Sequence, residues 1–363
     1  DFWNSRTQYF NYGKLKDGTY RGEPTALAAA AALYGLVDDE KARPMLERLA
    51  GNGFSTNWGV RVVSGTSRIF NPRSYQEGSV WPLMTGWTAL GEYTYGNSAQ
   101  GFMHAMNVMR IKNLWTLGFV QEVMNGAVNR PQGVCPHQCW SETNIIHPLV
   151  EGMIGWKPDA PAGTAALSPR FPADWDTATV SNLAVGTSRV TMRMRRGPGA
   201  TTYDLELTAG PAVSIALAPE IAAGMDVRRI VVDGKALAGN VSVRRGLLKD
   251  PVAVTLRERS SVRLEHTGGL AMVPEVPRPA PGDSALGYRI IAADMIASDY
   301  VVMLEGKPGT THDFLLATYD NPPLVAEGAE IVAAPRKGFT ALRVTFEPDG
   351  QPFVQRTVRV KIP

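Results

Sequence analysis

Hydrophobic residues recur at helical spacing in the first 156 residues of the chain and at strand spacing after them. Five segments of the first part carry apolar residues three and four positions apart, and we expect helices at 23–37, 38–49, 79–90, 97–114 and 141–154. Pro24 and Pro82 suit first helical turns, whereas Pro44 should distort the second helix. The pattern predicts short helices joined in pairs by loops.

From Ala165 onward, short runs rich in β-branched residues alternate with turn residues, which is typical of antiparallel strands. The predicted strands are 179–185, 189–194, 203–208, 213–217, 229–232, 252–256 and 261–266, then 288–291, 300–305, 313–318, 341–346 and 354–362. A proline-rich stretch, 274–281, separates the two groups as a linker. We therefore predict a multidomain α plus β protein: a helical domain at 1–156, a β-sandwich at 157–272 and a second β-rich, sandwich-like accessory domain at 273–363.

Length and charge narrow the classes of protein to which the chain can belong. At 363 residues it is too long for one ordinary core, and a formal net charge of +3 gives no electrostatic case for nucleic-acid binding. No window approaches the length of an uninterrupted apolar membrane span. We expect a soluble protein whose partners include neither nucleic acid nor a membrane.

The two cysteines lie in one short stretch, where Cys135 and Cys139 flank His137. They are too few and too close together to frame a disulfide-dependent secreted domain. A zinc site would need a fourth ligand that this spacing does not supply. We predict no metal and no cofactor.

Three passages of the helical part are more specific than its periodicity. They are Trp58-Gly-Val-Arg61, Ser74-Tyr-Gln-Glu-Gly-Ser-Val-Trp-Pro82, and Phe119-Val-Gln-Glu-Val-Met-Asn-Gly126 followed by Pro136-His-Gln-Cys-Trp-Ser141. In order and spacing they resemble bacterial glycogen-debranching glycosidases of the amylo-α-1,6-glucosidase type, within the six-hairpin glycosidase group. The resemblance covers residues 1 to about 155 and implies the C-terminal part of an (α/α)6 barrel, followed by the two β domains.

The resemblance implies an inverting glycoside hydrolase with two catalytic carboxyl groups. One carboxyl protonates the glycosidic oxygen, and the other activates a water on the opposite face of the sugar, about 6.5–9.5 Å away. Glu122 stands where the family places its general base, on the loop after the fourth helix. The family's general acid lies upstream of the segment where this chain starts. We therefore expect it to be missing here, and to come from a preceding segment of the same protein or from a partner chain that completes the barrel.

Side chains near Glu122 in the motifs suit a sugar, which offers an apolar C–H face and a ring of hydroxyls. We expect substrate contacts from Trp58, Arg61, Tyr75, Gln76, Glu77, Trp81, Gln138 and Trp140. Together Trp58, Arg61, Trp81 and Gln138 should ring a hollow with Glu122 at its base. Helix packing and loop fixation are the alternatives for the tryptophans and the amides, and helix N-terminal charge is the alternative for Glu77.

The leading functional hypothesis is an α-glucosidase or debranching-like enzyme of carbohydrate metabolism that acts on an oligo- or polysaccharide. Gln76-Glu77 and Leu83-Met84 depart from residues common in the family, so the sugar pocket is expected to differ. An α-L-rhamnosidase-like activity and a non-catalytic carbohydrate-binding or assembly component remain alternatives. Bacterial cytoplasm and periplasm both remain open.

Overall fold

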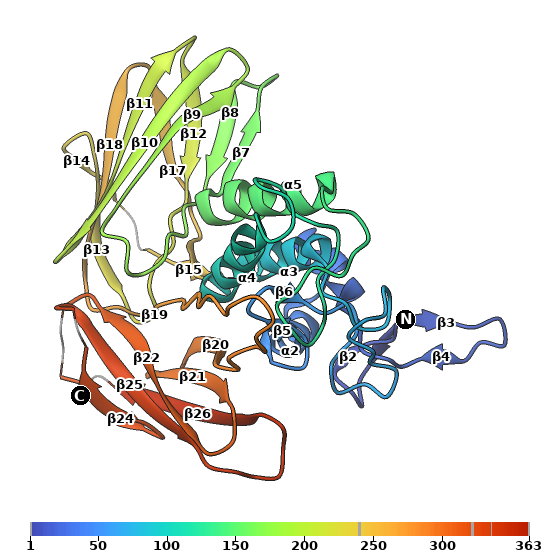
Figure 1. Cartoon of the computed structure of the whole chain (residues 1–363). Coiled ribbons are helices and arrows are strands. Elements are labelled where there is room, and N and C mark those ends of the chain that lie inside the picture. The colour runs from blue at the N-terminus through green and yellow to red at the C-terminus, as the bar shows by residue number, and fades with distance from the viewer. Residues whose placement is uncertain (1, 239–240, 321–322, 335, 362–363) are drawn as a thin grey trace.

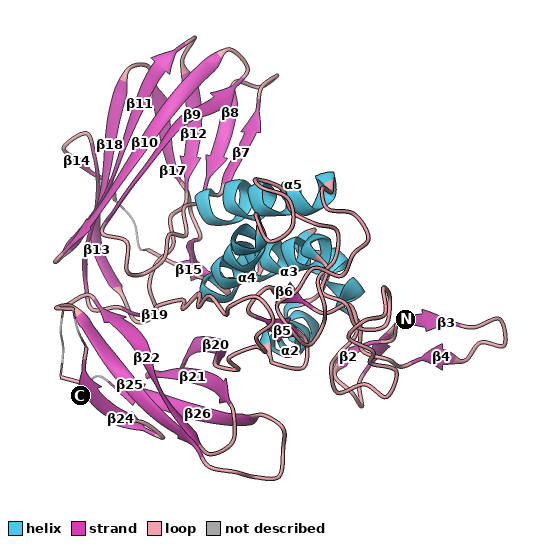
Figure 2. Cartoon of the chain, in the orientation of Figure 1, coloured by secondary structure: helices cyan, strands magenta, loops and turns pink. Residues whose placement is uncertain are grey.

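The computed structural model describes the chain except for residues 1, 239–240, 321–322, 335 and 362–363. Its described part contains few helices and many strands. The helices gather beside two separate β units, and the N-terminal hairpins project on the side away from both (Figures 1 and 2). Within the residues described, no helix has the length and hydropathy needed to cross a membrane.

The helical part contains short helices and three two-stranded hairpins. The helices are a 3-10 helix at Ala26–Ala28, α1 (Ala29–Leu33), α2 (Asp39–Ala50), α3 (Pro82–Thr94), α4 (Ser98–Ile111), α5 (Cys139–His147) and a π-helix at Pro148–Ile154. The hairpins pair β1 (Trp3–Asn4) with β2 (Tyr9–Phe10), β3 (Gly13–Lys14) with β4 (Tyr20–Arg21), and β5 (Ser55–Thr56) with β6 (Gly59–Val60).

Sequence periodicity located most of these helices but misjudged the first. Helix was expected over 23–37, whereas α1 and the 3-10 helix cover only 26–33 and Gly35 follows with a φ of 66°. That left-handed backbone angle suits glycine and ends the helix. Pro44 lies inside α2 without ending it. Gly155, the expected stop of the fifth helix, indeed caps the π-helix in the left-handed conformation.

The first β unit consists of two facing sheets. The six-stranded sheet has the order β14-β13-β18-β11-β10-β9 and the four-stranded sheet the order β17-β12-β8-β7. The strands are β7 (Trp156–Asp159), β8 (Thr164–Leu167), β9 (Thr177–Val185), β10 (Ser188–Gly197), β11 (Ala200–Ala209), β12 (Val213–Leu217), β13 (Asp226–Val232), β14 (Lys235–Ala236), β17 (Val252–Leu256) and β18 (Arg259–Thr267), with a separate hairpin of β15 (Val243–Arg244) and β16 (Leu247–Leu248). Buried Tyr93 and Met153 of the helical part join this unit's core.

The second β unit pairs two four-stranded sheets, ordered β19-β22-β25-β24 and β20-β21-β26-β23. The strands are β19 (Leu270–Met272), β20 (Arg289–Ile296), β21 (Asp299–Gly306), β22 (Thr310–Thr318), β23 (Val325–Glu327), β24 (Glu330–Ala333), β25 (Phe339–Phe346) and β26 (Val354–Lys361). Met103 of α4 reaches this unit's core. Each predicted strand overlaps an observed one, although Ile362, at the end of the last, lies outside the described residues. The helical part therefore packs against both β units.

Candidate active site

Backbone pairing brings the three motif passages side by side. Isolated antiparallel bridges join Arg61 to Val80, Val80 to Met124, and Met124 to Pro131. The amide of Val80 donates to the carbonyl oxygen of Met124 at 2.8 Å, and the amide of Met124 donates back at 2.9 Å. Segments far apart in sequence thus form one narrow ladder, and Glu122 lies two residues from its centre.

Glu122 is buried and oriented by a tyrosine. Glu122 is only 5% exposed, and its backbone amide donates to the carbonyl oxygen of Cys135 at 2.9 Å. The hydroxyl of Tyr75 donates to Glu122 Oε1 at 2.5 Å. Loss of solvent around the phenol, together with this hydrogen bond, raises the pKa of Tyr75 to about 12. Tyr75 therefore stays protonated at neutral pH and is the hydrogen-bond donor to Glu122.

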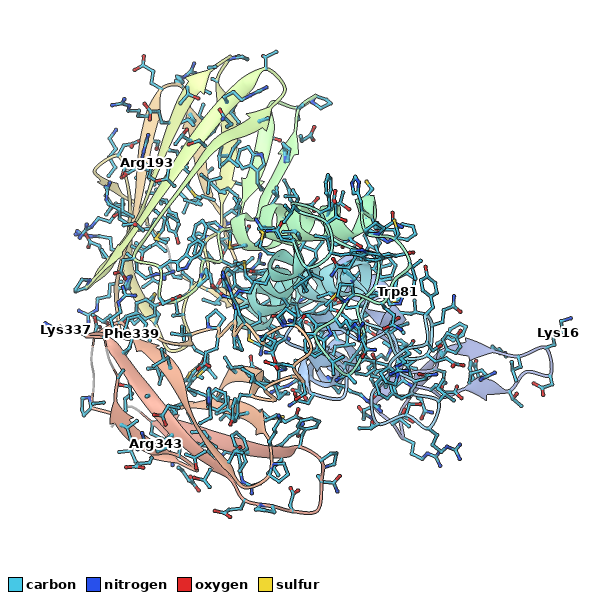
Figure 3. All side chains as sticks on the ribbon, viewed as in Figure 1. Lys16, Trp81, Arg193, Lys337, Phe339 and Arg343 are labelled. Carbon is cyan, nitrogen blue, oxygen red and sulfur yellow. The ribbon has the colours of Figure 1, made fainter. Side chains whose placement is uncertain are left out.

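Trp81 completes this cluster. Its ring meets the Tyr75 ring edge-on with centroids 4.6 Å apart, and its Nε1 donates to the Tyr75 carbonyl oxygen and to Ser79 Oγ, both at 3.0 Å. Figure 3 labels Trp81 on the helical side of the molecule, away from the two β units. Glu122, Tyr75 and Trp81 form the part of the expected site that the structure brings together.

The remaining motif side chains lie at different depths. Gln76 and Glu77 are exposed, Gln138 is half-buried, and Trp140 is 41% exposed in the first turn of α5. The amide of Gln138 donates to the carbonyl oxygen of Val120. This bond ties the start of α5 to the Glu122 loop, which is the segment 112–138 between α4 and α5. These residues remain candidates for substrate contacts at an open rim.

The structure corrects the role expected for Trp58 and binds Arg61 to the backbone. Trp58 is fully buried and its Nε1 donates to the carbonyl oxygen of Asn125 at 2.9 Å. Arg61 donates from Nε to the carbonyl oxygen of Gly126 at 2.6 Å and from Nη1 to that of Asn52 at 2.7 Å. Both side chains therefore hold the loop that carries Glu122 through backbone carbonyl groups. Trp58 has no exposed face for a sugar, whereas a sugar contact from the half-buried Arg61 stays a prediction.

The hollow expected around Glu122 stays a prediction. Two cavities lie elsewhere, lined by described residues, and Glu122 lines neither. One lies beside Glu305, and the other lies where the helical part meets both β units. At Glu122 itself the structure shows Tyr75 within hydrogen-bond distance, and Trp81 packed edge-on against Tyr75.

The second β unit braces the loops of the site, a feature the sequence did not indicate. Glu305 Oε1 accepts hydrogen bonds from the amide and the Nδ2 of Asn52, at 2.6 and 2.7 Å. Asn52 in turn offers its carbonyl oxygen to Arg61, which holds Gly126. A continuous chain of polar contacts therefore runs from β21 to the loop that carries Glu122.

The predicted linker takes part in the same brace. The amide of Asn129 donates to the carbonyl oxygen of Asp283 at 2.8 Å, and its Nδ2 donates to that of Pro279 at 3.0 Å. The amide of Leu286 donates to Asn57 Oδ1 at 2.8 Å. Residues 279–287 are thus a strap across the loops of the site.

Sequence reasoning also missed a buried polar triad. His104 Nδ1 lies 2.7 Å from Glu92 Oε2, and its Nε2 contacts the hydroxyl of Ser55. This order of groups matches a nucleophile, base and orienting acid, but all three residues are at most 1% exposed. Burial raises the pKa of Glu92, and His104 opposes that rise. Since a substrate has no access to it, the triad serves to fix β5 to α3 and α4. A charged residue within an otherwise uncharged helix, Glu92 in α3, is the sequence feature that could have indicated it.

The described residues offer an oriented carboxylate at Glu122 and no group of metal ligands. No three histidine, cysteine, aspartate or glutamate side chains converge as a metal site in the described part of the chain. Cys135 and Cys139 are free thiols. A buried carboxylate with a hydroxyl donor can exchange a proton with a bound water or hydroxyl.

Comparison with known proteins supports a glycosidase relationship for part of the chain. Residues 1–141, less than half of the chain, match the family model of the mannosylglycerate hydrolase MGH1-like glycoside hydrolase domain. No curated protein matches the chain.

Similar solved structures share little sequence with this chain. The GH63 mannosylglycerate hydrolase from Thermus thermophilus in complex with glucose is 18% identical over 41% of this chain and 36% of that one, with a TM-score of 0.35. The α-L-rhamnosidase from Dictyoglumus thermophilum is 9% identical over 66% and 25%, with a TM-score of 0.41. The GH127 β-L-arabinofuranosidase from Geobacillus stearothermophilus is 10% identical over 92% and 58%, with a TM-score of 0.33.

This chain spans less than two thirds of the length of each of these three structures, and their TM-scores are too low to establish a shared fold. The family match is more specific, and it is to the MGH1-like domain. It does not support the glycogen-debranching type that the motifs resemble. What the comparisons establish is that residues 1–141 match a glycoside hydrolase domain.

Proposed function

We propose that this chain is part of an inverting glycoside hydrolase and supplies one of its two catalytic carboxyl groups, Glu122. The observation that carries the proposal is the 2.5 Å hydrogen bond from Tyr75 to Glu122, inside the segment that matches a glycoside hydrolase domain. A carboxylate that is held by a protonated phenol keeps one orientation toward the sugar, and orientation accounts for much of the catalytic effect of such groups.

In this mechanism Glu122 acts as the general base. It takes a proton from a water as the water oxygen attacks the anomeric carbon, and a second carboxyl protonates the departing glycosidic oxygen. That acid is proposed to lie outside this chain, on a preceding segment of the same protein or on a partner chain that completes an (α/α)6 barrel. Trp140 would offer a ring face to the sugar, while Gln76, Glu77 and Gln138 would hydrogen-bond its hydroxyls. Trp81 is only 8% exposed and packs edge-on against Tyr75, so its proposed role is to hold Tyr75 in place.

The substrate class is an oligosaccharide or a small glycoside. Because the family match names mannosylglycerate hydrolases, the substrate panel should include mannosylglycerate beside aryl α-D-glucosides, α-D-mannosides and α-L-rhamnosides. NMR of the first product anomer would report whether configuration at the anomeric carbon is inverted.

The decisive test is Glu122→Gln in the full-length protein. The amide keeps an acceptor for Tyr75 but cannot take a proton, so kcat should fall by about 10²–10⁴-fold with little change in the unfolding midpoint. Glu40→Gln, at an exposed position of α2, is the matched control and should keep full activity. Turnover that survives Glu122→Gln would rule Glu122 out as the base. Sugar binding without turnover in both the unmodified protein and the variant would instead favour a non-catalytic binding component.

A further inference from the structure

A second polar region lies away from Glu122, at the junction of the three parts of the molecule. A cavity of ≈ 390 Å³ is lined by residues 95–100 from the end of α3 and the start of α4, by the first β unit and by β20 and β21. In Figure 1 this is the region near β15 and β19, where the two β units approach each other. None of the described residues expected to bind sugar lines it. Its volume falls within the range of about 300–1,000 Å³ that is typical of small-molecule sites.

The cavity has an excess of positive charge once its ion pairs are set aside. Arg245 is paired with Asp39, and Asp294 lies 3.2 Å from Arg43. This leaves three charged groups on the cavity wall, namely Arg170, Arg196 and Glu220. Loss of solvent raises the pKa of Glu220, although the Ser98 side chain and the charges of Arg170 and Arg196 oppose the rise. Two guanidinium groups and one carboxyl with a raised pKa give this wall a net positive charge, which favours an anionic occupant.

Several buried nitrogen atoms on the wall have no hydrogen-bond partner within the protein. They include Nε2 of Gln100, Nε of Arg170 and Nδ1 of His266, in residues that are 3%, 8% and 2% exposed, and Nε of Arg245. Buried polar groups are almost always paired, because leaving one unpaired loses the hydrogen bond it would make to water. Since Gln100 and Arg170 offer N–H donors, the missing partner is an acceptor.

Aromatic side chains complete the wall. Tyr203 and Tyr300 are buried there, and Tyr319 is half-buried with Arg196 stacked 5.6 Å from its ring centroid. Ring faces suit the C–H surface of a polyol or sugar, and the Glu220 carboxyl can accept from its hydroxyls.

We propose that this junction cavity is a binding site for a small polyhydroxylated carboxylate, such as a sugar acid. Arg170 is its charge partner, and Gln100, His266 and Glu220 are its hydrogen-bonding partners. Because its walls come from all three parts of the molecule, an occupant would hold those parts together. The site does not depend on the function proposed for Glu122.

Calorimetric titration of the chain with D-gluconate, D-glucose and acetate tests the proposal. Gluconate should bind once per chain and about tenfold or more tightly than either other probe, because glucose lacks the carboxylate and acetate lacks the hydroxyls. The thermal unfolding midpoint should rise with gluconate concentration, since a ligand that binds only the folded state stabilises it. If the folded chain binds no gluconate, or binds all three probes equally, the proposal is wrong.

Variants locate the site. Gln100→Met and Arg170→Met should each weaken gluconate binding by about tenfold or more, and using both guards against a failure of one variant to fold. Arg193→Met is the matched control, since Arg193 is exposed on β10 and pairs with Glu206; it should bind as the unmodified chain does. Glu122→Gln should also bind normally. Binding that is lost in Glu122→Gln but kept in Gln100→Met and Arg170→Met would place gluconate at the Glu122 site and overturn the proposal.

Discussion

The loops around Glu122 and the junction cavity are both polar regions where the helical part meets other parts of the molecule, but they differ in how their buried N–H donors are paired. Around Glu122, the donors of Trp58, Arg61 and Tyr75 reach acceptors within the protein. In the cavity, Gln100 and Arg170 keep buried N–H groups without a protein partner. Donors paired within the protein fix one geometry, as a catalytic carboxylate needs, whereas buried donors without a protein partner favour an acceptor from solution.

This contrast predicts different costs for removing a buried polar side chain in the two regions. Arg61→Met leaves the carbonyl oxygens of Asn52 and Gly126 without their donor, so the free energy of unfolding should fall by about 2–4 kcal/mol. Gln100→Met removes a donor that has no partner, and the loss should stay below about 1 kcal/mol. Urea unfolding followed by tryptophan fluorescence suits this comparison, because seven of the eight tryptophans lie in the first 156 residues. Equal losses in both variants would remove the distinction between the regions.

A smaller effect is expected at the far end of the brace. Glu305→Gln keeps an oxygen for Asn52 but replaces charge-assisted hydrogen bonds with neutral ones. It also removes the carboxylate that offsets the effect of burial on the pKa of Arg289, which is lowered to about 10. Stability should fall by about 1–2 kcal/mol, and amide hydrogen exchange should speed up in residues 52–57 and 125–130.

Glu330→Gln, at an exposed position of β24, is the control for this change and should leave both stability and exchange as they are. If exchange in the two loops stays unchanged in Glu305→Gln as well, the contact between β21 and Asn52 does not restrain the Glu122 loop. The polar contacts from β21 would then have no effect on the opening of these loops.

Local pattern predicted the elements of this fold better than it predicted their assembly. The apolar spacing of α2, α3 and α4 and the short runs of the β units were sufficient to locate them, because period and turn residues act over a few positions. The contact between Asn52 and Glu305 joins residues 253 positions apart, and no local pattern specifies it. The junction cavity likewise arises only from the relative placement of three parts.

The candidate site shows the same limit. Motif spacing indicated Glu122, and the structure places it beside Tyr75 and Trp81. Sequence could not tell that Trp58 and Arg61 face backbone carbonyls, because an indole or a guanidinium has the same donors whether it meets a sugar or the main chain.

The smallest expected effect is a pH dependence that belongs to the cavity alone. Burial raises the pKa of Glu220 above its usual value of 4.5, so between 4.5 and the raised pKa the folded chain binds more protons than the unfolded chain. This contribution to stability is complete below pH 4.5 and is lost as pH rises through the folded-state pKa.

Glu220→Gln cannot titrate, so its unfolding free energy should decline less than that of the unmodified chain over this window, in urea unfolding at a series of pH values. Arg170→Met, which removes a cation that opposes the rise, should extend the window to higher pH. Parallel pH profiles for Glu220→Gln and the unmodified chain would mean that the pKa of Glu220 is the same in the folded and unfolded chain. Solvent in the cavity would then hydrate this carboxyl, which would weaken the contrast with the Glu122 region.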